Sequence, residues 1–486
     1  MGDTSPRPTG SPADDEPRTG AATAPGAPGD ALVLFGATGD LARKKLFPAL
    51  YQLAARDALR VPVVGVALSD WDDTDLRAYA RDAIDATVPD RSETVVDQLI
   101  ARLTLVPGDY AEDTTFARLA ERLGGARRPV HYLAIPPALF PTVVEGLRRA
   151  GLHTGARVVV EKPFGRDLAS ARRLNATLHE AFAEAAIFGI DHYLGKEPVE
   201  NLLAFRFANS FLEPIWNRNY IASVQVTMAE SFGVEGRGGF YDSVGAIRDV
   251  VQNHLLQVVA FLAMEPPAGD SPDALRDEKV KVVRAMRPID CAHLVRGQYA
   301  GYTDEPGVAP GTTVETYAAL RLAIESWRWA GVPFYVRAGK ALAATALEAL
   351  VELREPPRPL YAGAGTPAPH PNVLRFRLGG GDGVTLTVQA KAPGDVPATR
   401  PIDLRVDFAS ALGERHSAYE RLLADALAGD PRRFARQDMV EEAWRVVAPA
   451  IEDPGPVYPY EPKTWGPPEA DRVLGDDHWH DPEPPA

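Results

Sequence analysis

The stretch Ala31-Leu-Val-Leu-Phe-Gly-Ala-Thr-Gly-Asp-Leu-Ala42 decides the fold of the first half of the chain. Five apolar residues run without a break into Gly36, which is typical of a short parallel strand buried on both faces. The glycines follow the pattern G-x-x-G-x-x-A, and residues 46–59 then have helical spacing. A strand, a glycine turn and a helix in this order predict a dinucleotide-binding unit, with a tight turn that binds nothing as the alternative.

Four further apolar runs alternate with helical segments along the first half. They lie at residues 61–68, 103–106, 130–135 and 157–161. Strands that alternate with helices predict an α/β fold with a doubly wound parallel sheet. We therefore expect a Rossmann-like dinucleotide-binding domain over residues 30–188.

The pattern changes after about residue 191. Strand-like runs follow at 221–230, 374–378, 384–390 and 402–408, and helical segments at 249–264, 417–428 and 439–451. These runs predict one α+β domain over residues 189–465, with helices and a large, mainly antiparallel sheet. Residues 1–29 have almost no bulky apolar side chains, so we expect a disordered tail, and 466–486 form a Pro-rich, acidic tail.

Composition excludes several classes of function. The 486 residues carry a net charge of −14, which argues against a nucleic-acid binder. No apolar run approaches the roughly 18 residues that span a bilayer, and no secretory signal opens the chain, so we expect no membrane partner. The single cysteine, Cys291, excludes a disulfide framework and favours a reducing, cytoplasmic compartment. Only nine of the 52 basic residues are lysines, so the positions of the lysines are informative.

The second predicted strand ends in Leu68-Ser-Asp70, where such folds distinguish NAD from NADP. Ser69 can bond to the ribose hydroxyls of NAD or to the 2′-phosphate of NADP, and Asp70 leans slightly toward NAD, so the cofactor stays open on these residues alone. Arg43, Lys44 and Lys45 lie in the first helical turns, where cations oppose the helix dipole. Anionic ligands explain them, and a solvated basic face is the alternative.

Three short segments carry groups suited to chemistry. Glu161-Lys-Pro163 closes a strand and predicts either a cis peptide beside the cofactor or an ordinary turn. Asp191-His-Tyr-Leu-Gly-Lys196 combines an acid, an imidazole, a phenol and an ammonium, which suits an anionic, hydroxylated ligand better than an exposed loop. His254 lies on an apolar helix, where a histidine is usually a core residue. If Asp191 contacts His254 in the folded protein, the pair instead indicates a general base.

These segments resemble the glucose-6-phosphate dehydrogenase family, and the resemblance runs in order from about residue 31 to about 465. The residues that carry it are Gly36–Leu46, Glu161–Gly165, Asp191–Glu197, Phe207–Asn209, Glu213–Arg218, Glu235–Asp242, Arg248–Gln257 and Arg337–Lys340. Asp-His-Tyr-Leu-Gly-Lys-Glu is highly specific to that family.

The resemblance implies oxidation of the C1 hydroxyl of glucose 6-phosphate to the 6-phospho-lactone, with reduction of a nicotinamide dinucleotide, in the oxidative pentose phosphate pathway. It implies His254 as the general base and Asp191 as its partner. The implied substrate contacts are Lys162, His192, Tyr193, Lys196, Glu230, Asp249 and Lys340. The implied cofactor contacts are Gly36, Thr38, Gly39, Asp40, Leu41, Lys45, Ser69, Asp109, Tyr110, Pro136 and Lys162. No metal is implied, and the family is typically a homodimer or homotetramer.

Three positions depart from the family's pattern. NADP-preferring members carry an arginine where this chain has Leu68, so NADP is expected from the family and NAD from this substitution. Gly189 stands where an arginine is common, and Gly379 replaces a polar residue in a region that holds a second, structural NADP in some members. We therefore do not expect that second site.

Two other functions fit part of the pattern. A different Rossmann-type sugar oxidoreductase also places Glu-Lys-Pro after a strand, but the cluster at residues 192–196 has little purpose without a phosphate. A nucleotide-binding paralogue with impaired catalysis fits the three departures, but it leaves His254, Asp191 and Lys162 without a purpose.

Overall fold

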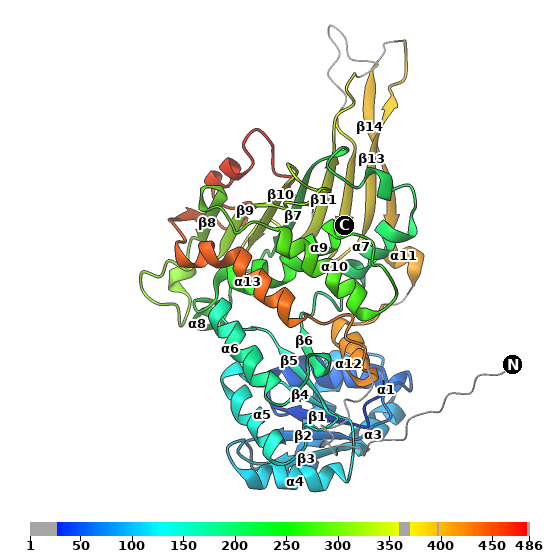
Figure 1. Ribbon diagram of the computed structural model, residues 1–486, viewed down its shortest axis with the longest axis vertical. Coiled ribbons are helices and arrows are strands. Elements are labelled where there is room, and N and C mark those ends of the chain that lie inside the picture. The colour runs from blue at the N-terminus through cyan, green and yellow to red at the C-terminus, as the bar shows by residue number, and fades with distance from the viewer. Residues whose placement is uncertain (1–26, 359–369, 396–397, 414, 484–486) are drawn as a thin grey trace, which may run out of the picture.

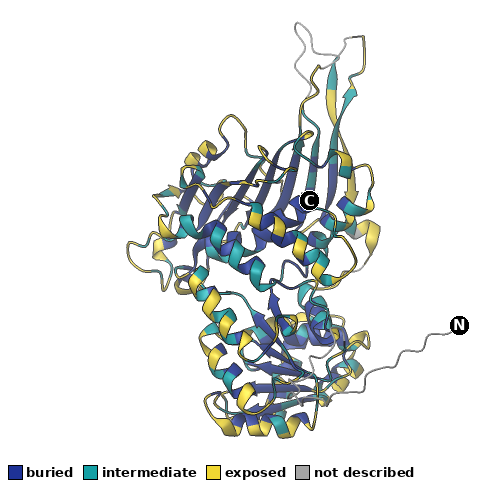
Figure 2. Ribbon diagram, in the orientation of Figure 1, coloured by how far each residue is buried: buried dark blue, intermediate teal, exposed yellow. Residues whose placement is uncertain are grey.

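The computed structural model describes residues 27–358, 370–395, 398–413 and 415–483. Two sheets, each with its own helices, stack end to end along the long axis of the molecule (Figure 1). Buried residues concentrate along both sheets and on the helix faces turned toward them (Figure 2). None of the helices in the described ranges is long and apolar enough to cross a bilayer.

The first sheet is parallel throughout, as predicted. Its strand order is β3-β2-β1-β4-β5-β6, so the chain winds outward in both directions from β1. The strands are β1 Ala31–Phe35, β2 Val63–Ala67, β3 Leu103–Pro107, β4 Pro129–Leu133, β5 Arg157–Glu161 and β6 Ile187–Ile190. The covering helices are α1 Phe47–Ala55, α2 Asp73–Thr87, α3 Glu93–Ala101, α4 Asp113–Leu123, α5 Phe140–Arg149 and α6 Leu168–His179. The reversal of strand order between β1 and β4 creates the crevice where such sheets bind nucleotides.

The second sheet has nine strands in the order β14-β13-β12-β11-β7-β10-β9-β8-β15. The pairs β10–β7 and β15–β8 are parallel and the others antiparallel, which confirms the mainly antiparallel prediction. The strands are β7 Ile221–Ala229, β8 Leu294–Tyr299, β9 Tyr317–Ala323, β10 Pro333–Gly339, β11 Ala346–Leu353, β12 Val373–Arg377, β13 Gly383–Lys391, β14 Thr399–Asp407 and β15 Val457–Tyr460.

Helices cover one face of this second sheet. They are α7 Glu197–Ala208, α9 Leu256–Ala263, α10 Pro272–Ala285 and α13 Gln437–Glu452, with the short α8 Gly238–Tyr241 and α11 Phe408–Leu412 at the periphery. The segment Ile247–Leu255, predicted as part of an α-helix, is a π-helix that continues directly into α9. Phe334 and Val336 of β10 point into the core under these helices.

The structure refines the predicted domain boundary in two ways. First, the expected break between residues 188 and 189 falls inside β6, which sequence reasoning did not identify. Second, helix α12 Ala418–Ala428 returns from the second half of the chain to the first sheet. Leu422 and Leu423 of α12 share a hydrophobic core with Phe188 of β6, so this helix from the second half of the chain packs against the first sheet (Figure 1).

The structure describes part of each predicted tail. Residues 1–26 of the predicted N-terminal tail lie outside the described residues, and the Gly29 amide donates to the Leu427 carbonyl at 2.6 Å. Residues 466–483 pack on the sheet face opposite the helices, with Val473 and Leu474 buried. Their aromatic and acidic side chains have partners there. The Arg337 guanidinium lies 4.7 Å from the Trp479 ring centre and 3.0 Å from Asp481.

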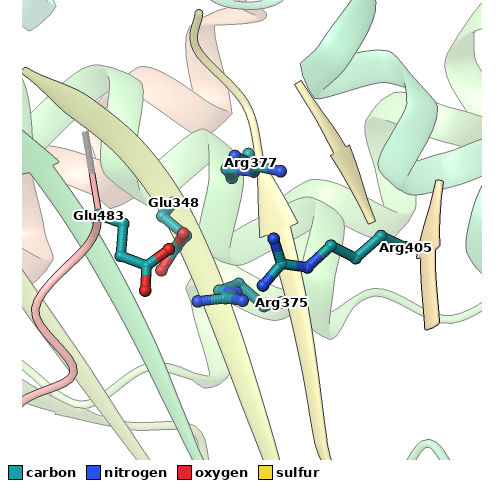
Figure 3. Close-up of a pocket in the computed structure, with 5 residues that line it drawn as sticks. All are labelled: Glu348, Arg375, Arg377, Arg405 and Glu483. Carbon is teal, nitrogen blue, oxygen red and sulfur yellow. The ribbon is translucent and has the colours of Figure 1, made fainter. Parts of the chain in front are cut away.

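This C-terminal segment also contributes to a small pocket on the second sheet. Figure 3 shows Glu483 beside Glu348 of β11, facing three arginines of β12 and β14. They are Arg375, Arg377 and Arg405. A Pro-rich and acidic composition therefore does not prevent this segment from packing, because the sheet supplies the cations that its carboxylates need.

Candidate active site

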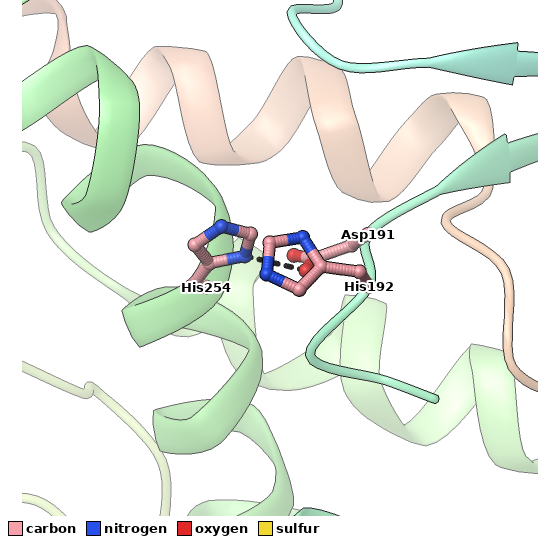
Figure 4. A group of neighbouring side chains, drawn as sticks. All are labelled: Asp191, His192 and His254. Carbon is pink, nitrogen blue, oxygen red and sulfur yellow. Dashed lines mark hydrogen bonds and ion pairs between the residues drawn. The ribbon is translucent and has the colours of Figure 1, made fainter. Parts of the chain in front are cut away.

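The predicted chemistry-bearing residues meet where the first sheet abuts the helices of the second. Lys162 follows β5, and Asp191 follows β6, at the carboxyl ends of neighbouring parallel strands. His254 comes from the π-helical segment that faces them (Figure 4). Parallel strands place their carboxyl ends at one edge of a sheet, which is why segments distant in sequence converge here.

Asp191 and His254 form a buried hydrogen-bonded pair. The His254 Nδ1–H donates to Asp191 Oδ1 at 2.5 Å, and the Tyr193 amide donates to the same oxygen at 3.0 Å. Burial raises the pKa of the Asp191 carboxyl, but the charge of His254 and its hydrogen bond outweigh burial and hold that pKa below its usual range. Burial lowers the pKa of the His254 imidazole, and Asp191 opposes this effect. The carboxylate thus fixes the orientation of the ring and leaves Nε2 on its other side.

Lys162 occupies that other side. The Lys162–Pro163 peptide is cis, as one of the two interpretations predicted. The Lys162 ammonium lies 2.9 Å from His254 Nε2 and donates to the Asp249 carbonyl at 2.9 Å and to Asp249 Oδ1 at 3.1 Å. Burial raises the pKa of the Asp249 carboxyl, but the charge and hydrogen bond of Lys162, together with the charges of His254 and Lys340, outweigh burial, and the net shift is downward. An ammonium can only donate, so His254 Nε2 is the acceptor and carries a lone pair.

The segment after Asp191 surrounds this pair with potential phosphate ligands. The Tyr193 ring stacks on His254 with 4.0 Å between ring centres, and the Lys196 ammonium lies 3.8 Å from the centre of the Tyr193 ring. Burial lowers the pKa of His192 to about 3, so its imidazole is neutral at pH 7. The Tyr193 hydroxyl donates to Met228 Sδ at 3.4 Å. The structure therefore brings His192, Tyr193 and Lys196 together beside His254, with the Tyr193 hydroxyl turned toward the sheet.

The remaining predicted substrate contacts form an adjacent wall. The Lys340 ammonium forms an ion pair with the Glu230 carboxylate at the ends of β10 and β7, and it lies 5.2 Å from the Phe232 ring centre. Lys340 and Asp249 both line a cavity of about 180 Å³. The other lining residues are Phe232, Gly233, Val234, Glu235, Arg237, Phe240 and Tyr241. The wall offers charged and aromatic groups to a polar ring.

The glycine turn has the close approach that a dinucleotide cradle requires. Gly36 has a φ of +79°, and a Cβ there would lie 2.3 Å from the Ala134 carbonyl oxygen, so only glycine fits. The Gly36 amide donates to the Tyr110 hydroxyl at 3.1 Å, and that hydroxyl donates to the Val66 carbonyl at 3.2 Å. Tyr110 thus braces the turn from within the core. The helix that follows Gly39 runs through the π-helical segment Ala42–Leu46 into α1, so a helix start with free backbone amides lies directly after the turn.

The other predicted cofactor contacts surround this turn. Tyr79, which sequence reasoning did not single out, donates from its hydroxyl to the Thr38 carbonyl at 3.0 Å. Asp40 pairs with Lys44 at 2.8 Å on the surface, and Leu41, Lys45, Asp109 and Pro136 lie on the turns and helix starts nearby. The Ser69 hydroxyl is buried and finds no partner within the described part of the chain. The turn and this orphaned hydroxyl both fit a bound nucleotide.

Leu68, the residue at which the family pattern carries an arginine, directly follows β2, and 73% of its surface is exposed. A large apolar side chain at the rim of the crevice supplies no charge to a 2′-phosphate.

Tyr419 of α12 is a site residue that sequence reasoning missed. Its ring lies nearly parallel to His192, at 13° and with 6.3 Å between ring centres. Arg421 of the same helix donates to the Gly195 carbonyl at 2.7 Å, and a Cβ at Gly195 would lie 2.8 Å from the Ala418 carbonyl oxygen. Helix α12 therefore supports the segment 191–196 from behind. No local pattern marks Tyr419, because its role depends on a contact across more than two hundred residues.

Asp191, His192 and His254 are also the one group of potential metal ligands in the described ranges, with ligand atoms within 4.8 Å of one another (Figure 4). Asp191 and His254 use facing atoms for their mutual hydrogen bond. The Lys162 ammonium lies against the free His254 nitrogen, where it repels a cation. The arrangement suits proton transfer better than metal binding.

Comparison with known proteins agrees with this geometry. Residues 33–201 match the model of the glucose-6-phosphate dehydrogenase NAD binding domain, and residues 203–480 match that of the glucose-6-phosphate dehydrogenase C-terminal domain. The chain is 47% identical over 458 residues to glucose-6-phosphate 1-dehydrogenase 1 of Mycobacterium tuberculosis, covering 94% of this chain and 97% of that protein.

Two solved structures are similar over nearly their whole length. The crystal structure of glucose-6-phosphate 1-dehydrogenase from Mycobacterium avium has a TM-score of 0.88 and 46% identity, covering 94% of this chain and 99% of that chain. A glucose-6-phosphate dehydrogenase in complex with its substrate glucose-6-phosphate has a TM-score of 0.87 and 34% identity, covering 95% and 100%.

Proposed function

Since the chain belongs to the glucose-6-phosphate dehydrogenase family, we propose that it oxidises C1 of glucose 6-phosphate to 6-phospho-glucono-1,5-lactone, a step of the oxidative pentose phosphate pathway. The hydrogen-bonded series Asp191–His254–Lys162, with His192, Tyr193 and Lys196 beside it, is the observation that carries this proposal. A base with an oriented lone pair and a cationic anchor for the other end of the substrate are the two parts that the reaction requires.

His254 acts as the general base. Its Nε2 accepts the C1 hydroxyl proton. In the free enzyme the Lys162 ammonium donates a hydrogen bond to this nitrogen, at the position that the C1 hydroxyl takes when the substrate binds. Asp191 stabilises the resulting imidazolium through the Nδ1–H bond, and it keeps the ring in the tautomer that exposes Nε2. General-base catalysis of this kind contributes roughly 10²–10⁴-fold to the rate.

The substrate is held at both ends. His192, Tyr193 and Lys196 receive the phosphate, with charge-assisted hydrogen bonds from the lysine. Glu230, Asp249 and Lys340 contact the sugar hydroxyls from the wall of the cavity. Lys162 lies between sugar and cofactor.

The nicotinamide dinucleotide, when bound, accepts the hydride that leaves C1. The cradle for it comprises the turn residues Gly36, Thr38, Gly39, Asp40 and Leu41, with Lys45, Ser69, Asp109, Tyr110 and Pro136 around it. NADP is the cofactor that family membership favours, and NAD is the one that Leu68 favours, because an apolar side chain gives a 2′-phosphate no partner.

The enzyme forms a homodimer or homotetramer in this proposal, in a reducing cytoplasm suited to its single cysteine. Support for self-association comes from edge strand β14, where Ile402, Leu404 and Val406 are exposed on one face. An exposed apolar edge strand is a liability in a monomer and is commonly covered by a partner.

Steady-state kinetics with glucose 6-phosphate and with glucose, each paired with NAD and NADP, test the proposal. We expect kcat/KM to be about 10- to 10²-fold higher for the phosphorylated sugar, since a hydrogen bond to a charged group is worth about 1.5–3 kcal/mol. Equal efficiency on both sugars would favour a dehydrogenase of unphosphorylated sugars. No turnover with either cofactor would favour a nucleotide-binding paralogue.

A further inference from the structure

A second carboxylate lies next to the active site without a part in the mechanism described above. Glu161 closes β5 directly before Lys162. The Tyr132 hydroxyl of β4 donates to Glu161 Oε1 at 2.5 Å. The Tyr419 hydroxyl of α12 is a second hydrogen-bond partner of the same carboxyl group. One side chain therefore joins the strand end that carries Lys162 to a helix from the far end of the chain.

Tyr419 connects the Glu161 carboxyl to the predicted phosphate contacts. Its hydroxyl meets Glu161, and its ring lies nearly parallel to the His192 ring, as described above. Within the described residues the Glu161 carboxyl is the hydrogen-bond partner of the Tyr419 hydroxyl, so the carboxyl holds the tyrosine, whose ring lies nearly parallel to the His192 imidazole. A shift of Tyr419 changes the surface on which His192 rests.

The surroundings of Glu161 make this contact sensitive to its charge. The groups that face the carboxyl are Tyr132, Tyr419, Lys162 and Asp191. Burial raises the pKa of Glu161 to about 7, although the two tyrosine hydroxyls and Lys162 pull it down. An ionised carboxylate accepts from both hydroxyls at once, whereas a protonated one carries its own hydrogen and offers less acceptor capacity.

We propose that Glu161 is a positioning residue for the substrate phosphate. Its carboxylate holds the Tyr419 hydroxyl and thereby fixes the position of the His192 ring relative to Lys162, the residue that follows Glu161 at the end of β5. This inference rests on the proposed function, because the phosphate is the group that His192 receives there.

Glu161→Gln tests the idea, because it keeps the size of the side chain and removes one acceptor and the charge. At pH 8 we expect the KM for glucose 6-phosphate to rise about tenfold, as befits a lost hydrogen bond to a charged group, while kcat and the KM for the dinucleotide change less than about threefold. Asp477→Asn is the matched control, because Asp477 accepts from the Tyr335 hydroxyl at 2.9 Å on the distant sheet face. An unchanged KM, or parallel losses in both KM values and kcat, would overturn the proposal.

The pH dependence gives a readout that a merely structural role would not move. The ratio of the variant's KM to that of the wild type should be largest at pH 8 and fall toward one at pH 6, because the wild-type carboxyl becomes protonated over that range. A ratio that stays constant from pH 6 to pH 8 would contradict the assignment.

Tyr419→Phe keeps the inference testable if Glu161→Gln does not fold. This variant retains the ring and loses the hydroxyl, so it should reproduce the tenfold rise in KM for glucose 6-phosphate. In the double variant the two increases in KM should not add, since both substitutions remove the same Glu161–Tyr419 hydrogen bond. Additive effects would show that the residues act independently. A wild-type protein with no activity on glucose 6-phosphate would refute the proposed function itself, a result distinct from each of these.

Discussion

Asp191 Oδ1 and His254 Nδ1 lie 2.5 Å apart in the interior of the protein, although 63 residues separate them in the sequence. This contact orients the ring of a histidine on an apolar helix, as the proposed general base requires. The ring cannot rotate without breaking a charge-assisted hydrogen bond, so its Nε2 stays directed at Lys162 and the substrate position.

Removal of the base should abolish turnover and spare cofactor binding. We expect His254→Ala to lower kcat by at least about 10²–10⁴-fold, with a dissociation constant for the dinucleotide within twofold of wild type, because His254 lies outside the glycine turn. Initial rates and fluorescence titration with reduced cofactor measure the two quantities. His480→Ala, which removes a histidine paired with Glu348 on the far sheet, is the control. An unaltered rate in His254→Ala would refute the base assignment.

Lys196 should not tolerate arginine. Its ammonium sits against the Tyr193 ring in a half-buried position, and a planar guanidinium is larger and places its donors differently. We expect Lys196→Arg to raise the KM for glucose 6-phosphate about tenfold, measured by initial rates over a range of substrate. Lys281→Arg, an exposed lysine paired with Glu278, should leave the KM unchanged. Normal affinity in Lys196→Arg would remove Lys196 from the phosphate site.

Leu68 should control the choice of dinucleotide. Leu68→Arg places a guanidinium at the exposed end of β2, where it can pair with a 2′-phosphate. We expect the ratio of kcat/KM for NADP to that for NAD to rise about tenfold, equivalent to about 1.4 kcal/mol. Leu68→Gln controls for the loss of the apolar side chain. If the wild type already prefers NADP strongly and the ratio does not change, another cation holds the phosphate.

His131 should make the protein sensitive to acid. It is fully buried in β4, and burial lowers its pKa to about 4 from an ordinary value of 6.5. Between those two values the unfolded chain binds the proton and the folded protein does not, so stability falls as the pH drops from about 6.5 toward 4, by up to about 3 kcal/mol. The thermal unfolding midpoint of His131→Asn should therefore fall less steeply over this range than that of wild type. Equal slopes would contradict this, and His370→Asn, at an exposed position, should match the wild-type slope.

The sequence allowed the local parts of this fold to be predicted. Residues 31–42 indicated a strand, turn and helix because burial on both faces and the need for glycine at Gly36 leave marks at adjacent positions. The apolar runs of the first sheet did the same. The four-residue strand β6 escaped notice because Gly189 interrupts its short apolar run.

Long-range placement could not be predicted in the same way. No spacing reveals that β10 lies between β7 and β9, or that α12 returns to the first sheet. For the same reason the side chain of Tyr419 and the junction at Glu161 emerged only from the structure. The prediction for His254 depended on whether Asp191 contacts it, and only the structure shows that contact.

The most direct test of the central claim follows the hydrogen at C1. Glucose 6-phosphate deuterated at C1 should yield reduced dinucleotide that carries the deuterium, detected by mass spectrometry of the cofactor, and His254→Ala should form almost none of it in the same time. Deuterium found in water instead, or labelled cofactor formed at the wild-type rate by His254→Ala, would contradict the account.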